Sequence, residues 1–383
     1  MTTVLDNDGM QILHGHVLDV LQSLPAQSVQ CVVTSPPYWG LRDYGLEPVV
    51  WGGDLSHAHE WGEDRHSRAG RDWDPTLGRS PVTRDYKVST GAFCSACSAW
   101  RGSLGLEPTP ELYVEHLVAV FREVWRVLRD DGTCWINLGD SYAANRSYQV
   151  PSTKGGPKHS SAQADQSSNR VPDGLKPKDL IGIPWRVAFA LQADGWYLRS
   201  DIIWAKPNPM PESVTDRPTK AHEYLFLLSK SARYCYDCEA IREPVSPNWS
   251  PKNAPTVNEL GSHVLTNGQR GHQRRLTFTE AKGANRRSVW RVDPSTDVWD
   301  ITTCPYKGAH FATFPPALVT PCVLAGSRVG DVVMDPFVGS GTVMAVAKAH
   351  GRRALGIELN LEYIQLAINR LFTVKSHAPL TPA

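Results

Sequence analysis

The chain has 383 residues, of which 41% are hydrophobic and 21% are charged, and its formal net charge is +1. This composition is ordinary for a globular protein, and the small net charge argues against a generally basic nucleic-acid coat. No apolar run reaches the roughly eighteen residues of a transmembrane helix, and the first ten residues lack the basic flank and apolar stretch of a signal peptide. We therefore expect a cytoplasmic protein without a membrane partner. Eight cysteines are too few for a disulfide scaffold in a chain of this length.

The N-terminal residues predict a strand, a helix and a second strand. Gln11–Leu13 is short and apolar, and Asp19–Leu24 has a helical pattern that ends at Pro25. Val29–Val33 is the second strand. Residues 41–105 are rich in Gly, Asp, Arg and Trp and lack periodicity, which indicates a long insert with little regular structure.

The middle of the chain alternates regular elements with polar loops. An amphipathic helix is predicted over Glu111–Leu128, because its apolar residues cover one broad face. Residues 145–178 are rich in Ser, Gln, Lys and Gly, which is typical of a flexible loop. The other elements predicted here are a strand at Thr133–Leu138, a helix at Leu180–Ala193, and strands at Tyr197–Trp204 and Tyr224–Leu228.

After a variable basic section at 237–300, helices and strands alternate again. The predicted elements are helices at His310–Ala325, Thr342–His350 and Asn360–Phe372, and strands at Val332–Met334 and Ala354–Glu358. This alternation predicts an α/β fold in which a parallel sheet carries helices on both faces.

Two turn motifs lie about 300 residues apart. Ser35-Pro36-Pro37-Tyr38-Trp39 follows an apolar run at 31–33, and the segment Asp-Pro-Phe-Val-Gly-Ser-Gly-Thr at 335–342 follows another at 332–334. A buried strand that ends in a tight turn places the turn at the carboxyl edge of a parallel sheet, where α/β proteins bind ligands. The two turns therefore predict a single site that joins a cofactor to a substrate.

These motifs resemble those of the amino-group DNA methyltransferases. Ser-Pro-Pro-Tyr resembles their catalytic motif, Asp-Pro-Phe-x-Gly-Ser-Gly-Thr resembles their S-adenosylmethionine motif, and this order is similar to the beta class. The resemblance covers most of residues 10–372. It implies a Rossmann-like methyltransferase sheet with a circularly permuted motif order and irregular inserts. Residues 10–236 and 301–372 would form the catalytic and cofactor-binding halves of one domain, and 237–300 a target recognition section.

The Gly-rich turn is predicted to hold S-adenosylmethionine. Gly339 and Gly341 let the backbone approach a ligand, and the helix that starts at Thr342 favours a carboxylate. Asp335 is expected to accept a hydrogen bond from the cofactor's ammonium or to organise the loop. Glu358 is expected to bind the ribose hydroxyls. NAD binding is the main alternative on residue chemistry alone, and the lack of a Gly-Lys-Ser/Thr segment argues against a nucleoside triphosphate.

Further cofactor contacts are implied by the resemblance. It places Asp19 against the adenine amino group, although the residue pattern also fits a helix N-cap. Phe311, Thr313 and Phe314 match the last cofactor motif of the family. Phe337 and the two phenylalanines of this motif are expected to line the binding site of the cofactor's methionine chain. Simple core packing is the alternative for Phe314.

The Ser-Pro-Pro-Tyr turn supplies the predicted catalytic groups. An exocyclic amine is a poor nucleophile because its lone pair is delocalised into the base, and two acceptors aimed at its N–H groups draw the nitrogen toward tetrahedral geometry. Ser35 Oγ and the Pro36 carbonyl are the candidates, held by the stiff turn that Pro37 completes. Tyr38 is expected to stack on a flipped base, and Trp39 to extend that stack or to line the pocket.

The resemblance also bears on the target base. In the family, Ser at the first motif position favours cytosine N4 and Asp favours adenine N6, so Ser35 favours N4-methylcytosine and leaves N6-methyladenine as the alternative. Methylation of cytosine C5 needs a cysteine nucleophile, and Pro321-Cys322 lies in a predicted helix. RNA or protein glutamine as the substrate, and a catalytically idle DNA-binding module, are further alternatives.

The insert contains a candidate metal site. His57-x-His59 and Cys94-x-x-Cys97 supply two imidazoles and two thiols, which suit a tetrahedral structural zinc. Such a metal would also explain how an irregular segment holds a shape. Reduced surface thiols with unrelated histidines are the alternative.

DNA contacts are predicted on several segments. Lys206 and Arg217 lie in segments that resemble family positions near the target base and are candidates for phosphate contacts, with ordinary surface charge or an ion pair with Glu223 as the alternative. Between Lys252 and Arg291 there are eight Lys or Arg and two Glu, which fits a DNA-facing section or a solvated loop. The arginines assigned to recognition are Arg270, Arg274, Arg275, Arg286 and Arg287. Double-stranded DNA is the expected partner, and a homodimer and a cognate restriction enzyme are candidates that the sequence leaves open.

Overall fold

The computed structural model describes the chain in segments. These are residues 2–40, 46–54, 56–61, 92–143, 175–206, 209, 212, 214–243, 285–291 and 314–374, together with the backbone of four strands at 65–69, 84–88, 256–258 and 273–275. Among these residues, no helix is both long enough and apolar enough to cross a membrane.

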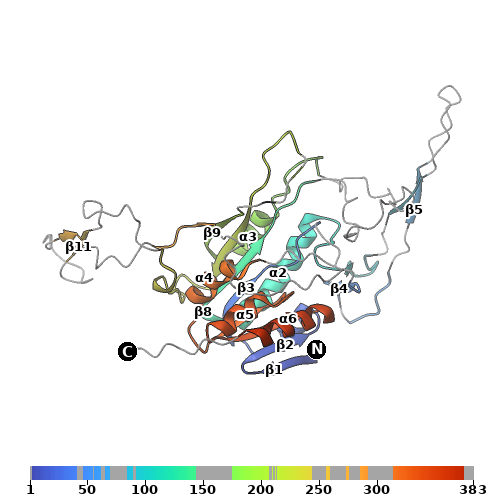
Figure 1. Ribbon diagram of the computed structural model, residues 1–383. Coiled ribbons are helices and arrows are strands. Elements are labelled where there is room, and N and C mark those ends of the chain that lie inside the picture. Colours follow the sequence, from blue (N-terminus) through green and yellow to red (C-terminus); the bar gives the residue numbers. More distant parts are fainter. Residues whose placement is uncertain are drawn as a thin grey trace.

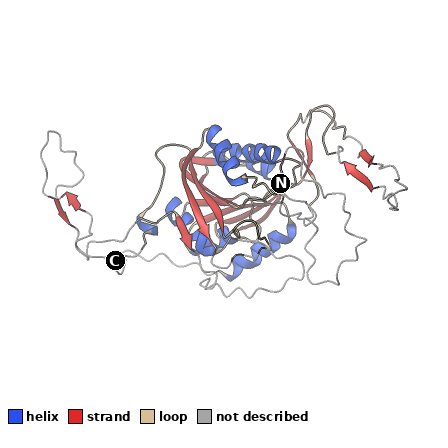
Figure 2. Ribbon diagram, turned by 90° about the horizontal axis from the view of Figure 1, so that it is seen from above, coloured by secondary structure: helices blue, strands red, loops and turns tan. Residues whose placement is uncertain are grey.

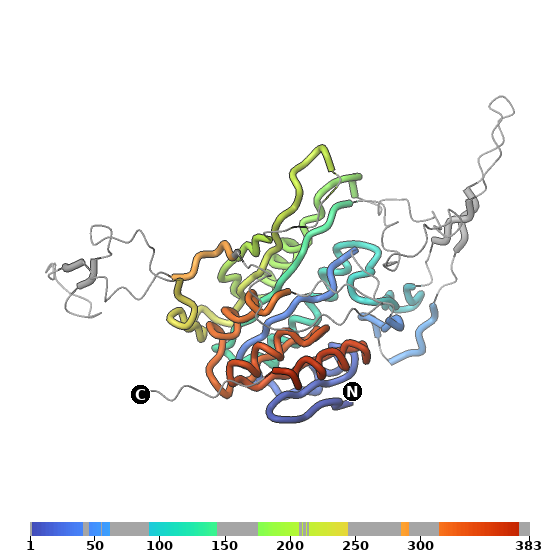
Figure 3. The backbone as a smooth tube through the Cα atoms, viewed as in Figure 1, coloured from blue at the N-terminus to red at the C-terminus, as the bar shows by residue number. Residues whose placement is uncertain are grey.

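A nine-stranded sheet forms the centre of the described structure (Figure 1). In sheet order the strands are β1 (Thr2–Asn7), β2 (Met10–His14), β15 (Arg353–Glu358), β14 (Val332–Asp335), β3 (Val29–Thr34), β8 (Leu128–Leu138), β10 (His222–Ser229), β9 (Tyr197–Ala205) and β13 (Val289–Arg291). The five strands from β2 to β8 run parallel to one another. Strands from the two ends of the chain, blue and red in Figure 3, therefore lie side by side in the same sheet.

Helices cover both faces of the sheet (Figure 2). One face carries α1 (Val17–Ser23), α2 (Pro110–Val127) and α3 (Ile183–Ala193), and the other carries α4 (Pro316–Gly326), α5 (Thr342–Ala349) and α6 (Leu361–Thr373). Successive residues of a strand point to opposite faces. Val32 of β3 accordingly joins the first core, whereas Cys31 and Val33 join the second.

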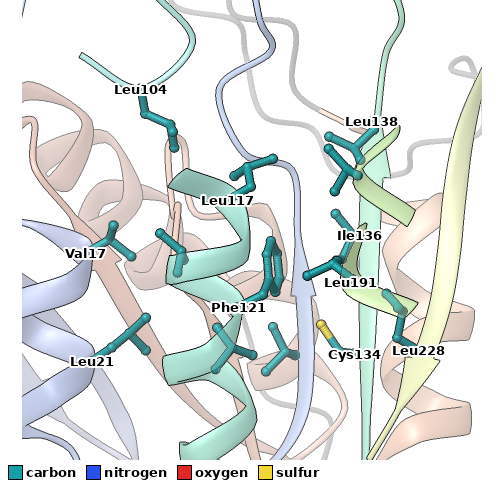
Figure 4. Close-up of a cluster of buried hydrophobic side chains, with 14 of the residues drawn as sticks. Val17, Leu21, Leu104, Leu117, Phe121, Cys134, Ile136, Leu138, Leu191 and Leu228 are labelled. Carbon is teal, nitrogen blue, oxygen red and sulfur yellow. The ribbon is translucent and has the colours of Figure 1, made fainter. Parts of the chain in front are cut away.

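The long helix α2 shows how local sequence and packing agree. Thr109 caps its N-terminus, because the Thr109 side chain accepts a hydrogen bond from the Leu112 amide at 3.2 Å, and Pro110 occupies the first turn. Leu117 and Phe121 of its apolar face are fully buried against the sheet (Figure 4). The predicted helix, Glu111–Leu128, is displaced by one residue at each end.

The predicted parallel sheet is found in the five central strands, but antiparallel strands extend it at both edges, so the sheet as a whole is mixed. β10 runs antiparallel to both β8 and β9, and β1 runs antiparallel to β2. A parallel connection needs a crossover, usually a helix, whereas antiparallel strands do not. No helix occurs among the described residues between β9 and β10, so the chain returns beside β9 in the opposite direction.

The insert at 41–105 contains more regular structure than its sequence predicts. β4 (Val49–Trp51) pairs with β7 (Trp100–Gly102), and β5 (Arg65–Ala69) pairs with β6 (Arg84–Val88). The basic section at 237–300 contributes a short 3-10 helix, η3 (Glu239–Ile241), the strand β13 of the main sheet, and a separate pair of β11 (Thr256–Asn258) with β12 (Gln273–Arg275). Residues 145–174 of the predicted flexible loop lie outside the described residues.

Candidate active site

The two turn motifs meet at the carboxyl edge of the sheet. β3 ends at Thr34 and β14 ends at Asp335, and these two strands are hydrogen-bonded neighbours. The Thr34 hydroxyl donates to Asp335 Oδ1 at 2.7 Å, although the residues are 301 positions apart. Ser35 and Pro336 therefore begin adjacent turns, which is the arrangement that the apolar runs before them predict.

A cavity of about 270 Å³ opens between these turns. Its volume is near the lower end of the range for small-molecule sites. The predicted residues that line it are Ser35, Pro36, Pro37, Tyr38, Phe314, Asp335, Phe337, Gly339, Thr342 and Glu358. The predicted catalytic turn and most of the predicted cofactor residues thus share one cavity.

Asp335 organises the start of the Gly-rich turn. Its Oδ1 accepts from the Thr34 hydroxyl and also from the Phe337 amide at 3.0 Å. Burial raises the pKa of Asp335 to about 7, although these two hydrogen bonds act in the opposite direction. Of the two predicted roles, organisation of the loop is the one that these contacts support.

Glu358 holds the backbone around the cavity. Its Oε2 accepts from the Gly339 amide at 2.8 Å, and its Oε1 accepts from the Leu359 and Asn360 amides, each at 2.9 Å. Burial raises the pKa of Glu358, and the three amides partly offset that rise. This carboxyl therefore connects the Gly-rich turn to the end of β15.

The two glycines of the turn have different surroundings. Gly339 lines the cavity with φ of 51°, and the nearest heavy atom to a Cβ placed there would be 4.0 Å away, so a side chain would occupy space beside the ligand site. Gly341 is the N-cap of α5 with φ of 80° and does not line the cavity. A Cβ at Gly341 would lie 2.8 Å from Ala367 Cβ, so this glycine is needed for close packing against α6.

A polar network surrounds the hydroxyl of Tyr38. Ser35 Oγ donates to this hydroxyl at 3.2 Å, and the hydroxyl lies 2.9 Å from both Asn137 Oδ1 and Glu223 Oε2. The other oxygen of Glu223 forms an ion pair with Lys206. Burial and the negative charge of Glu223 both raise the pKa of Tyr38, so the phenol stays neutral. Asn137 was not predicted as a site residue, because it lies inside the buried strand β8.

Contacts with α2 and with Gly139 also hold the Ser-Pro-Pro-Tyr turn. The Tyr113 hydroxyl of α2 donates to the Pro37 carbonyl at 2.8 Å. The Tyr38 ring packs directly on Gly139, where a Cβ would lie 2.6 Å from the ring. These contacts fix the turn before any substrate arrives.

Besides Gly341, the predicted residues Asp19 and Trp39 also lie away from the cavity. Asp19 is exposed in the first turn of α1 and does not line the cavity, and the N-cap of that helix is His16 rather than Asp19. Trp39 is 4% exposed, and its ring nitrogen donates to the Glu107 carbonyl at 3.0 Å. The predicted contact of Trp39 with DNA is therefore replaced by a position in the hydrophobic core.

The cavity is also lined by aromatic residues that the sequence analysis did not single out, among them His16 and Trp51. His16 and Trp51 lie edge to face with ring centroids 4.6 Å apart. His16 Nε2 is buried and has no hydrogen-bond partner among the described residues, and burial lowers the pKa of this imidazole. An unsatisfied buried nitrogen at the cavity fits a polar group of a ligand.

The predicted phosphate contacts are engaged in ion pairs. Lys206 pairs with Glu223, which is the alternative considered for it, and its ammonium lies 4.6 Å from the centre of the Trp204 ring. Arg217 pairs with Glu212 at 2.6 Å and stacks on another aromatic ring, that of Tyr142. Lys206 is thus held beside Glu223, which lines the cavity.

The predicted recognition arginines are only partly described. Arg287 pairs with Glu243 at 2.8 Å, and the Arg286 guanidinium lies 4.7 Å from the centre of the Trp290 ring. Predicted site residues that lie outside the described residues, or of which only the backbone is described, are Arg270, Arg274, Arg275, Phe311 and Thr313.

The four predicted metal ligands come together. One ligand atom from each of His57, His59, Cys94 and Cys97 lies within 4.8 Å of the others. No other such group of three or more His, Cys, Asp or Glu occurs among the described residues. The spacing of the two pairs in the sequence therefore predicted a real spatial cluster.

Comparison with known proteins identifies the family. Residues 29–369 match the DNA methylase family of N6/N4 methyltransferases. The chain is 41% identical over 368 residues to Type II methyltransferase M.Cfr9I of Citrobacter freundii, covering 96% of this chain and 89% of that one. It is 42% identical over 364 residues to Type II methyltransferase M.XycI of Xanthomonas campestris pv. cyanopsidis, covering 95% and 88%.

A solved structure has the same fold. The PvuII DNA methyltransferase, described as cytosine-N4-specific, aligns with a TM-score of 0.52 and 15% identity, covering 98% of this chain and 88% of that one. The chain thus belongs to the N6/N4 DNA methylase family. The predicted methyltransferase fold and the predicted class of S-adenosylmethionine-dependent DNA methyltransferase are confirmed.

The raised pKa of Asp335 predicts a specific dependence of stability on pH. An unfolded Asp has a pKa of about 3.9, whereas the native value is about 7, so the native state binds more protons in this interval. Asp335 therefore lowers the free energy of unfolding as pH rises from about 4 to about 7, by up to about 4 kcal/mol. Asp335→Asn removes this titration, so the melting temperature of the variant relative to the wild type should increase across that interval. Calorimetry of the cofactor-free proteins between pH 5 and 8 measures the difference, and a difference that stays constant or shrinks would contradict the assignment.

Proposed function

We propose that this enzyme transfers a methyl group from S-adenosylmethionine to an exocyclic amine within a specific DNA sequence, with cytosine N4 as the target and adenine N6 as the alternative. The observation that carries the proposal is the shared cavity, in which the Ser-Pro-Pro-Tyr turn faces the Gly-rich turn. A DNA substrate supports the cytoplasmic location expected from the sequence. The name Type II methyltransferase, which the relatives carry, supports a cognate restriction enzyme as a partner.

The residues of the cavity fit the cofactor. When bound, S-adenosylmethionine supplies an electrophilic methyl group. A carboxylate offers about four acceptor positions, and three amides already use those of Glu358, so about one remains for a ribose hydroxyl. Gly339 leaves room beside the backbone, Phe337 offers an aromatic wall, and His16 Nε2 offers an unsatisfied polar atom.

Ser35 is suited to bind the amine that is methylated. The Ser35 hydroxyl donates its proton to a hydrogen bond with the Tyr38 hydroxyl. The lone pairs of Ser35 Oγ are therefore free to accept a hydrogen bond from an N–H group of the base. The Pro36 carbonyl is proposed as the second acceptor. Positive charge develops on the nitrogen during transfer, and the Glu223 carboxylate lies one hydroxyl further along the same hydrogen-bonded chain.

Tyr38 is proposed to support a base that has left the duplex. Its hydroxyl is anchored to Asn137 and Glu223, and one side of its ring rests on Gly139. A ring fixed in this way can offer its remaining surface in the cavity to a flipped base at little entropic cost.

The target base is settled by one experiment. The purified enzyme, DNA of mixed sequence and labelled S-adenosylmethionine are incubated, and the nucleosides are then separated by mass spectrometry. We expect N4-methylcytosine. N6-methyladenine would establish the alternative base, and transfer to neither base would support the idle DNA-binding module instead.

Substitutions in the turn should separate chemistry from cofactor binding. Ser35→Ala removes the proposed acceptor, and Tyr38→Phe keeps the ring but removes the hydroxyl that orients Ser35. Each should lower kcat by about 100-fold, the usual cost of losing one polar group that acts in the transition state. The Kd for S-adenosylmethionine, measured by titration calorimetry, should stay within about twofold of the wild type.

Tyr236→Phe is the matched control, because Tyr236 is a partly exposed tyrosine that does not line the cavity. It should leave both kcat and cofactor affinity unchanged. Loss of cofactor binding in both Ser35→Ala and Tyr38→Phe would show that the turn belongs to the cofactor site and not to the chemistry.

Target recognition is proposed for the basic section at 237–300. Replacing Arg274 and Arg275 of β12 with Ala should weaken DNA binding and leave cofactor binding intact. If the side chains contact phosphates, the slope of log affinity against log salt should fall by about one unit per lost contact. If they contact bases, methylated-site sequencing should show relaxed choice at particular positions.

A double variant of Arg129 and Arg233 serves as the control. These residues lie at the start of β8 and just beyond the end of β10, at the opposite edge of the sheet from the cavity. Their replacement by Ala should change neither the affinity for DNA nor its dependence on salt. Equal effects of the two double variants would mean that recognition depends on overall charge and not on the basic section.

A further inference from the structure

The strongest unexplained cluster is the group of two histidines and two cysteines in the insert. His57 Nε2 lies 3.5 Å from Cys94 Sγ, and His59 Nδ1 lies 3.5 Å from Cys97 Sγ. With Zn–N bonds of about 2.0 Å and Zn–S bonds of about 2.3 Å, the nitrogen-to-sulfur edge of a tetrahedron is about 3.5 Å. The two observed nitrogen-to-sulfur distances therefore match those of a tetrahedral zinc site, and the ligand atoms of all four residues lie within 4.8 Å of one another.

The backbone holds the two ligand pairs against each other. The Cys94 amide donates to the Ala99 carbonyl at 2.8 Å, and the Ser98 amide donates to the Cys94 carbonyl at 3.0 Å, so the Cys-x-x-Cys segment forms a closed turn. The Ser95 amide donates to the Glu60 carbonyl at 3.0 Å, which joins this turn to the histidine segment. Gly53 is also pressed on the turn, since a Cβ there would lie 2.8 Å from Cys97 Sγ.

Four protein ligands leave no open coordination position, and this favours a structural role over a catalytic one. None of the four ligands lines the cavity. A metal bound here acts on the site only through the elements that it holds in place.

Those elements form one wall of the cavity. Ala99, the last residue of the cysteine turn, leads directly into β7, and β7 pairs with β4 so that Trp100 lies opposite Trp51. Trp51 is 3% exposed, lines the cavity and donates from its ring nitrogen to the Gly102 carbonyl at 3.1 Å. Val49 of β4 lines the same wall.

A stack of rings connects this wall to the catalytic turn. Trp51 and Trp100 each stack on His116 of α2, with ring centroids 4.9 and 5.4 Å away. His116 forms a buried pair with Glu107, whose other oxygen accepts from the Gly105 amide at 2.8 Å. The Gly105 carbonyl in turn accepts from the Gly40 amide, just after the Ser-Pro-Pro-Tyr-Trp segment.

We infer that a zinc ion bound by His57, His59, Cys94 and Cys97 fixes the β4–β7 pair as a wall of the cofactor cavity, so that zinc occupancy and cofactor binding are coupled. The coupling rests on the proposed cofactor role of the cavity, whereas the metal site does not. A short two-stranded pair is marginally stable alone, and a bound metal stabilises it by tying its ends together.

The test measures zinc and cofactor separately on the full-length protein. Elemental analysis of the wild type should give about one zinc per chain, and Cys94→Ser/Cys97→Ser should give none. The control is Cys235→Ser/Cys238→Ser, a second Cys-x-x-Cys pair with no clustered histidine, which should keep the metal. A wild type without zinc, or full zinc in Cys94→Ser/Cys97→Ser, would overturn the site.

Titration calorimetry with S-adenosylmethionine then tests the coupling. The zinc-free variant should bind about tenfold more weakly or worse, and the cysteine control should bind like the wild type. Because Cys94→Ser/Cys97→Ser can also destabilise the fold, the wild type is treated with a chelator and then resupplied with zinc, and affinity should fall and return. Unchanged affinity after zinc removal would overturn the coupling.

Trp51→Ala separates the wall from the metal. It should keep about one zinc and yet weaken cofactor binding, because the ring between His16 and His116 is lost. Normal cofactor affinity in Trp51→Ala would also contradict the coupling. If the zinc-replete wild type binds no S-adenosylmethionine at all, the cofactor role of the cavity fails while the metal site stands.

Discussion

The parallel pairing of β3 with β14 is the constraint on which the site depends. It brings Val32 beside Met334 and is completed by the hydrogen bond from Thr34 to buried Asp335. Each strand ends in a turn, and neither turn alone makes a cavity with both a polar reactive group and space for a cofactor. The chain closes a loop of about 300 residues to make this contact. Because the entropy of loop closure grows only slowly with length, long inserts between the two strands are tolerated.

The fold was predictable to the extent that local patterns decide it. Helices with clear caps, such as α2 after Thr109 and α6 after Asn360, began within a residue or two of their predicted starts, because capping is a local interaction. The direction of β10 was not predictable, since it depends on how the chain returns beside β9. In the site, the residues of the two turns were found because their motifs are contiguous. Asn137 was missed because a single polar residue in a buried strand has no sequence signature until its partner Tyr38 is known.

The burial of Trp39 and the hydrogen bonds of Glu358 could not be predicted from the sequence, and the reason is physical. Trp39 follows Tyr38 directly, yet Tyr38 lines the cavity whereas Trp39 begins a turn and buries its ring in the core, where the ring nitrogen donates to the Glu107 carbonyl. Glu358 was expected mainly as a ligand for ribose, but most of its acceptor capacity is used by backbone amides. A buried carboxylate must first satisfy the local backbone, and a ligand receives what remains.

The cavity is lined by more segments of the chain than the two turn motifs. The N-terminal turn and the C-terminal Gly-rich turn both line it, and so do His16 and Trp51, which lie outside both motifs. Trp51 comes from an insert whose sequence shows no periodicity, and its position is set by pairing with β7 and by stacking on His116. Affinity for a ligand in this cavity must therefore depend on the order of the insert as well as on the sheet. A metal bound by the insert would stabilise this wall, because the two short strands bury too little apolar surface to hold it by themselves.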